Sequence, residues 1–215
     1  MDARQLADGL IMFLGLVVLL TFHEFGHAWM AWKCGDDTAR LQGRVSLNPL
    51  VHMDLIGTVI LPLLMIFVPA SRFLVGWAKP VPVNPQNLRN PKLDDILVTL
   101  AGPMMNLFLA VMLVGLARVA LIAHVNVVAL ECWRMAKLSL ILFFFNLLPI
   151  PPLDGSQVVR VITGMSYAVY LQFARYGFII LILVLQIPII RELLTDATNK
   201  SQLIIAAWFG LPVEF

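Results

Sequence analysis

The chain has 215 residues, of which 60% are hydrophobic and only 13% are charged. Its mean hydropathy of +0.88 is far above that of an ordinary soluble domain, so the composition predicts a polytopic membrane protein. The formal net charge of +2 is small and the basic residues are dispersed, which excludes nucleic acid as an expected partner. The two cysteines, Cys34 and Cys132, share no metal-binding spacing, so a metal site has to use nitrogen and oxygen ligands.

The first half of the chain contains one clear membrane span. Residues 6–32 are almost entirely apolar and exceed the 20 or so residues that cross a bilayer. Residues 40–49 are short, partly alternating and closed by a proline, which favours a strand or a turn. The next apolar segment, residues 55–70, is interrupted by a glycine and a proline, is ended by a second proline and is marginal as a span. Three prolines in residues 80–85 then exclude a helix and predict an extended segment.

Four hydrophobic segments follow, and the last of them is too short to cross and is expected at the membrane interface. The chain therefore predicts an all-α bundle of about four to five transmembrane helices with a small re-entrant, β-like connector. We expect residues 1–215 to form a single membrane domain, with the core motifs in residues 6–162 and the C-terminal helices in residues 163–215. The four segments cover residues 94–123, 138–148, 167–190 and 202–211.

The distribution of lysine and arginine predicts the orientation of the chain in the membrane. The connector over residues 33–94 is rich in basic residues, whereas only Arg4 precedes the first span, so the connector should be cytoplasmic and the N-terminus outside. If the connector leaves and returns on the same side, residues 55–70 cannot cross fully and are either re-entrant or packed against the bundle. The basic residues of the connector are Lys33, Arg40, Arg44, Arg72, Lys79, Arg89 and Lys92.

An H-E-x-x-H pattern lies inside the first apolar segment. Residues four apart share one face of a helix, so His23 and His27 can present two imidazole nitrogens to one Zn²⁺, with Glu24 beside them to act on a water molecule. Ionisable groups at membrane depth cost roughly 2.5–3.5 kcal/mol each, which predicts a functional site. The alternative is a polar contact between helices. A catalytic zinc site needs one further protein ligand and an open position.

The third ligand is predicted to be Asp154, the one acid of an apolar neighbourhood that follows a run of prolines. An aspartate before Gly-Ser-Gln is also an ordinary helix N-cap, which is the alternative for this residue. Asn146, one or two helical turns earlier, is predicted to donate to the oxyanion that forms during hydrolysis. Its alternative is a hydrogen bond between helices.

Three motifs in this order resemble the site-2 protease family of intramembrane zinc metalloproteases. Residues 23–27 match the zinc-binding helix, residues 102–106 look like the G-P-x-x-N helix, and residues 146–155 match the N-x-x-P and L-D-G segment. Residues 43–54 and 76–85 resemble the compact bacterial branch of the family. The resemblance covers roughly residues 21–156. Many members carry a PDZ domain, but no segment here is long and polar enough to form one.

The resemblance implies that His23, His27 and Asp154 bind one zinc ion per chain and that Glu24 activates the water. It also implies a transmembrane segment of another protein as the substrate, and the bacterial-type plasma (inner) membrane as the location. A metal-binding carrier and a catalytically inactive membrane scaffold are the alternatives. A carrier has no need of a glutamate beside His23, and a scaffold has no need of the complete set. The sequence predicts no oligomeric state.

Overall fold

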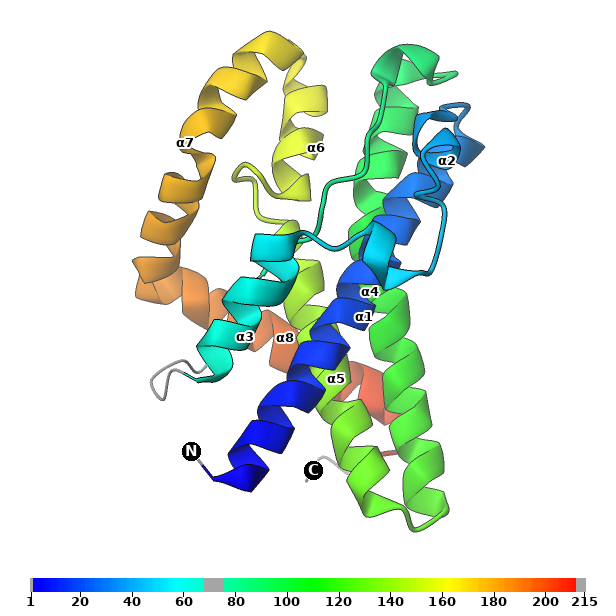
Figure 1. The fold of residues 1–215 in the computed structure, drawn as a ribbon, viewed down its shortest axis with the longest axis vertical. Coiled ribbons are helices and arrows are strands. Elements are labelled where there is room, and N and C mark those ends of the chain that lie inside the picture. The colour runs from blue at the N-terminus through cyan, green and yellow to red at the C-terminus, as the bar shows by residue number, and fades with distance from the viewer. Residues whose placement is uncertain (1, 68–75, 212–215) are drawn as a thin grey trace. The chain divides into compact units, whose positions relative to one another are not determined.

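The structure, a computed structural model, describes residues 2–67 and 76–211. The chain divides into two compact units, residues 1–91 and residues 92–215. Figure 1 shows the helices along the chain. They are α1 (Ala3–Lys33), α2 (Thr38–Leu41), η1 (Pro49–Val51), η2 (Leu55–Ile60), α3 (Leu61–Ile66), η3 (Pro85–Asn87), α4 (Pro91–Ile122), α5 (Asn126–Asn146), α6 (Asp154–Thr163), α7 (Tyr167–Gln186) and α8 (Pro188–Trp208).

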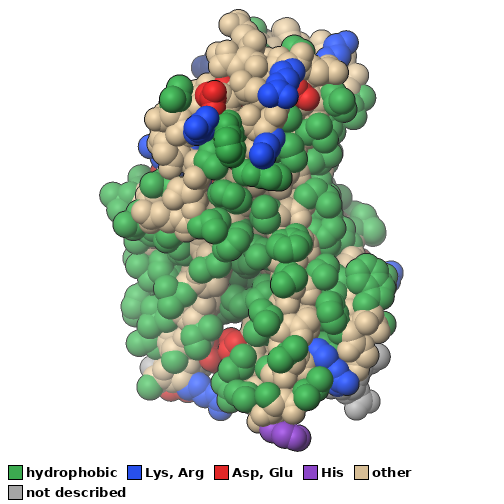
Figure 2. Space-filling model, turned by 90° about the vertical axis from the view of Figure 1, so that its right-hand side faces the viewer, with side chains coloured by type: hydrophobic (Ala, Val, Ile, Leu, Met, Phe, Trp, Pro, Cys, Tyr) green, Lys and Arg blue, Asp and Glu red, His purple; other side chains and the backbone are tan. Residues whose placement is uncertain are grey.

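The predicted all-α class is confirmed, since each of these elements is a helix of some kind. Three of the described helices, α1, α4 and α7, are long and apolar enough to cross a membrane, and each matches a predicted span. Large hydrophobic side chains are exposed along all three, for example Leu14, Phe108 and Phe178. Figure 2 shows hydrophobic side chains over most of the visible face, with the charged side chains in a few small groups. Such a surface is suited to contact with lipid rather than water.

In the first unit, α1 begins at a capping box, in which Asp2 and Gln5 each bond to the backbone N–H of the other. The π-helix η2 and the helix α3 have six residues each. At about 1.5 Å per residue the two together measure about 18 Å, well short of the ~30 Å hydrocarbon core. That the segment does not cross the membrane stays a prediction. The end of the predicted segment, residues 68–70, lies outside the described residues.

The connector of the first unit is folded by a few specific contacts. Met53 and Ala78 form an isolated antiparallel bridge, and the N–H of Trp77 donates to the carbonyl of Gly57. A side chain on Gly57 would lie 2.3 Å from the indole ring of Trp77, so this approach requires glycine. The expectation for residues 40–49 holds only in part, because Arg40 and the residue after it end the short helix α2.

In the second unit, α5 packs against α8. The amide of Gln202 on α8 donates to the backbone carbonyl of Trp133 on α5, and Ile205 and Ala206 are part of a buried hydrophobic cluster with Leu140. The C-terminal residues were expected at the membrane interface, but α8 instead contributes to the core of this unit. Helix α5 begins at Asn126, well before the predicted apolar segment.

Candidate metal centre

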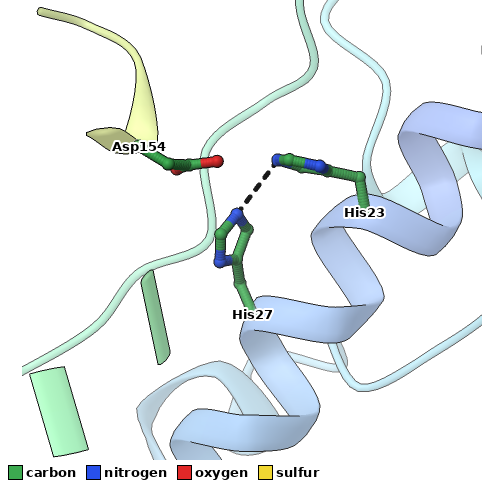
Figure 3. Close-up of side chains that lie close together, drawn as sticks. All are labelled: His23, His27 and Asp154. Atoms are coloured by element: carbon green, nitrogen blue, oxygen red, sulfur yellow. Dashed lines mark hydrogen bonds between the residues drawn. The ribbon is translucent and has the colours of Figure 1, made fainter. Parts of the chain in front are cut away.

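The imidazoles of His23 and His27 lie next to each other on α1. Their Nε2 atoms are 3.1 Å apart and their rings are almost perpendicular, with an interplanar angle of 82°. Figure 3 shows the two rings on successive turns of the helix, turned toward one another. Two nitrogens that bind one tetrahedral zinc ion at 2.0–2.1 Å are about 3.3 Å apart. The pair therefore fits two adjacent positions of a zinc site.

The two histidines and Glu24 belong to the most buried part of α1. His23 is 4% exposed, and Glu24 and His27 are 9% exposed each. The preceding polar residue, Thr21, bonds through its hydroxyl to the carbonyl of Val17, so it is satisfied within the helix. A buried carboxylate is costly unless a charge or a hydrogen bond compensates it. In this unit Arg44 and His52 are close enough to interact electrostatically with Glu24.

Asp154 lies in the second unit, in the first turn of α6 (Figure 3). The N-cap of α6 is Leu153, whose side chain makes no capping bond, so the alternative of an aspartate at the N-cap does not describe the structure. A carboxylate in the first turn is favoured by the helix dipole. The next polar side chain, Ser156, donates to the carbonyl of Leu153 and bonds to the hydroxyl of Tyr170 on α7.

Two glycines hold the segment that carries Asp154. A Cβ atom on Gly155 would lie 2.2 Å from the carbonyl oxygen of Leu147, just after the end of α5. A Cβ atom on Gly177, in α7, would lie 2.4 Å from the carbonyl oxygen of Pro151. Both distances are far below any contact that a real side chain makes. The backbone around Asp154 is therefore packed directly against α5 and α7, which fixes the start of α6.

Asn146 is the last residue of α5 and is half-buried. Its Nδ2 donates to the carbonyl of Leu142, one turn earlier in the same helix, at 2.9 Å. This bond lies within one helix rather than between helices, and the oxyanion role of Asn146 stays a prediction. One of the two N–H groups of the amide is used by this bond, and the other can serve a further acceptor.

The structure also identifies two buried polar residues in the connector, His52 and Arg44. His52 is 1% exposed and bonds through Nε2 to the carbonyl of Ser46. Arg44 is 4% exposed. Asp54 has a separate task, since its carboxylate caps η2. The sequence did not indicate that Arg44 is buried, because the basic residues of the connector predicted a cytoplasmic surface.

The fold and these residues define a helical membrane protein with an H-E-x-x-H metal motif in a span-length helix. The family model described as "Peptidase family M50" matches residues 11–129 and 121–186. The chain is 36% identical over 197 residues to a Bacillus subtilis protein named "Putative zinc metalloprotease YwhC", an alignment that covers 87% of this chain and 85% of that protein. It is 29% identical over 205 residues to "Putative zinc metalloprotease Rip2" of Mycolicibacterium smegmatis, with 93% and 73% covered. No solved structure matches the chain.

The chain therefore belongs to peptidase family M50, the site-2 protease family, as the motifs of the sequence predicted. It is a metalloprotease of the zinc-dependent class and an integral membrane protein. The predicted enzyme class and the predicted zinc cofactor are both confirmed.

Proposed function

We propose that the protein is an intramembrane protease, which hydrolyses peptide bonds in or near the transmembrane segments of other membrane proteins. The observation that carries the proposal is the position of the histidine pair. Two imidazoles with Nε2 atoms 3.1 Å apart, followed and preceded by apolar residues, lie in the buried part of a helix long enough to cross the bilayer. A zinc site at this histidine pair acts on peptide bonds at membrane depth.

In this proposal His23, His27 and Asp154 bind one zinc ion per chain. Two imidazoles and one carboxylate form a ligand set that catalytic zinc sites use, with the remaining position open to water. The packing of Gly155 and Gly177 supports the role of Asp154, because it fixes the backbone from which the carboxylate projects. Bound zinc would supply Lewis acidity toward a water molecule and toward the scissile carbonyl.

Glu24 is the proposed general base and acid. Its carboxylate accepts a proton from the attacking water and later donates it to the leaving amine. A base next to a metal ligand in the sequence stays at a fixed place relative to that ligand, because both belong to one rigid helix. Asn146 is proposed to donate its second amide N–H to the oxyanion. The bond from its first N–H to Leu142 supports this by fixing the orientation of the amide.

The substrate must be unwound locally, since a helix hides its carbonyls in its own hydrogen bonds. We propose that residues 81–83 receive the unwound peptide as an added strand. In the described part of the chain, the backbone groups of Val81 and Val83 make no hydrogen bond. Pro80 and Pro82 have no N–H and cannot donate to a substrate strand. Pairing is therefore favoured along the edge on which the backbone N–H and C=O groups of Val81 and Val83 lie. Residues 43–48, another short segment of the same connector, instead turn back on themselves through a bond from the N–H of Arg44 to the carbonyl of Ala39.

The proposed setting is the plasma (inner) membrane of a bacterium, with the N-terminus outside and the connector over residues 33–94 in the cytoplasm. The bacterial relatives support the proposed membrane, and the basic residues of the connector support the orientation. The partners are a transmembrane substrate and the lipid bilayer. We further propose that the two units act together as one protease domain.

The test compares Glu24→Gln with the unaltered protein on a model transmembrane substrate. Glutamine is nearly isosteric and is not a ligand here, so zinc content and folding should be retained. The cleavage rate should fall by about 10²–10⁴-fold, the usual contribution of a general base. A metal-replete Glu24→Gln protein that cleaves at the normal rate would exclude this mechanism. Zinc transport that survives in the same variant would favour a metal carrier instead.

A further inference from the structure

The connector of the first unit buries a positive charge. The side chain of Arg44 is 4% exposed, and one terminal nitrogen donates to the backbone carbonyl of Lys79 at 2.5 Å. A guanidinium group removed from water is unfavourable unless a negative charge or a full set of acceptors compensates it. Among the described residues, the Nε–H of Arg44 has no hydrogen-bond partner, so the compensation by hydrogen bonds is incomplete.

The negative charge that acts on Arg44 is the carboxylate of Glu24. Burial lowers the pKa of Arg44, and Glu24 raises it in part. The pKa of a guanidinium group is so high that the group stays charged at neutral pH even when burial lowers this pKa. Arg44 therefore presents a permanent positive charge within electrostatic reach of the proposed catalytic base.

His52 lies in the same part of the connector and does not share this role. Burial lowers the pKa of His52, the bond to Ser46 raises it, Arg44 lowers it further and Glu24 raises it, with a net decrease. The ring is therefore neutral at physiological pH, and its Nε2 carries the proton because a carbonyl accepts from it. The backbone carbonyl of His52 accepts from the N–H of Lys79 at 2.8 Å. Arg44 thus bonds to the carbonyl of Lys79, and His52 bonds to the N–H of the same residue. Of the two, only Arg44 carries a charge.

Lys79 leads directly into residues 81–83, the segment proposed to receive the substrate. We propose that Arg44 is a positioning residue for the hydrolysis: it anchors the start of the substrate-binding segment through its hydrogen bond to Lys79 and keeps a fixed positive charge within electrostatic reach of the carboxylate of Glu24. This inference rests on the proposed function. Arg44 in this way links residues 81–83, which bind the peptide, to Glu24, the base that acts on it.

Three variants separate the charge of Arg44 from its hydrogen bond. Arg44→Lys keeps the charge, Arg44→Gln keeps a neutral donor, and Arg44→Met keeps neither. We expect the kcat of Arg44→Lys to lie within about threefold of the unaltered protein, and the kcat of the two neutral variants to fall about tenfold or more. Zinc content and thermal midpoint are measured on each protein. Arg40→Gln is the matched control, since Arg40 lies exposed on α2, where it pairs with exposed Asp37 and lies over the ring of Trp32.

Equal kcat values for Arg44→Lys and Arg44→Gln would overturn the proposal, because charge would then have no effect. A change confined to KM in the neutral variants would also overturn it. If Arg44→Met does not fold, the comparison of lysine with glutamine still decides the question. The two failures are distinguishable: if Glu24→Gln is inactive while neutral variants of Arg44 keep full kcat, only the role of Arg44 is wrong. An active Glu24→Gln protein would instead overturn the proposed function itself.

Discussion

Asp36 and Asn84 are joined by a hydrogen bond of 2.7 Å from the backbone N–H of Asn84 to the carboxylate of Asp36, across 48 positions of the chain. The same carboxylate accepts from the backbone N–H and the hydroxyl of Thr38, and from the side-chain amide of Asn87. Asp36 is fully buried. One side chain thus ties the far end of the proline-rich segment to the turn that follows α1.

We expect Asp36→Asn to destabilise the protein at neutral pH by about 1–3 kcal/mol, because an amide cannot accept all of these bonds and leaves buried donors unpaired. The measurement is the thermal midpoint in detergent, compared with that of the unaltered protein. Asp37→Asn is the control, since the side chain of Asp37 is 54% exposed. A loss as large in Asp37→Asn as in Asp36→Asn would show that the effect is not specific to the buried carboxylate.

The stability that Asp36 contributes should also depend on pH. Burial, the largest single influence, raises the pKa of Asp36, but the hydrogen bonds from Thr38, Asn84 and Asn87 together lower it below its ordinary value of 3.8. A carboxylate with a depressed pKa stabilises the fold fully above the unfolded value, and this contribution is lost as the pH falls through the folded value. The difference in midpoint between Asp36→Asn and the unaltered protein should therefore be constant near neutrality and shrink below pH 3.8. A difference that does not change down to pH 2 would contradict this account.

Gly155→Ala should displace the start of α6. The new methyl group would meet the carbonyl oxygens of Leu147 and Leu148, which are backbone atoms and cannot rotate away. We expect a loss of about 1–3 kcal/mol in stability and weaker zinc binding. Gly115→Ala is the matched control: its Cβ would lie 3.1 Å from the ring of Phe209, which can move, and alanine favours a helix interior by roughly 0.5–1 kcal/mol. Equal effects of the two substitutions would argue against a specific clash at Gly155.

The proximity of the two histidines was the easiest feature to predict from sequence. His23 and His27 are separated by one helical turn, so their proximity follows from local geometry alone. The three spans found as α1, α4 and α7 were also predicted, because hydrophobic length is a local property. The start of α5 was missed because Glu131 and Arg134 interrupt its hydrophobic pattern. The two side chains form an ion pair at 2.9 Å along the helix, which the apolar criterion does not recognise.

The contacts that depend on tertiary structure could not be predicted. Arg44 and Lys79 are 35 positions apart, and no pattern in either segment indicates that they meet. Gly155 stands in the L-D-G segment, which the sequence analysis recognised as a motif, but the need for glycine there comes from the approach of Leu147 and is visible only in the fold. The role of a single residue therefore cannot be predicted from sequence spacing when it depends on a backbone atom elsewhere in the chain.

The proposed orientation can be tested by labelling single cysteines in a variant that lacks Cys34 and Cys132. Gln86 is exposed in the connector, and His124 is exposed in the turn between α4 and α5. A membrane-impermeant thiol reagent added to intact cells should label His124→Cys and leave Gln86→Cys unlabelled, because α4 is expected to cross from the cytoplasm to the outside. Opened cells should give labelling of both. Labelling of Gln86→Cys in intact cells would reverse the proposed topology.

The metal ligands lead to the last prediction. The purified protein should bind about one zinc ion per chain, and His23→Ala, His27→Ala and Asp154→Ala should each weaken zinc affinity by about 100-fold or more. This estimate is a lower bound, because even partners that only orient a ligand are worth 10–100-fold. His124→Ala is the control, since His124 is exposed in a turn and has no place in the proposed site. Zinc is measured by elemental analysis after dialysis against a weak chelator, beside the thermal midpoint of each variant. Asp154→Ala is the decisive member of the series, because the histidine pair alone already fits two zinc positions. Full zinc occupancy in folded Asp154→Ala would mean that another residue completes the site, while loss of zinc in all three variants but not in His124→Ala would establish the ligand set.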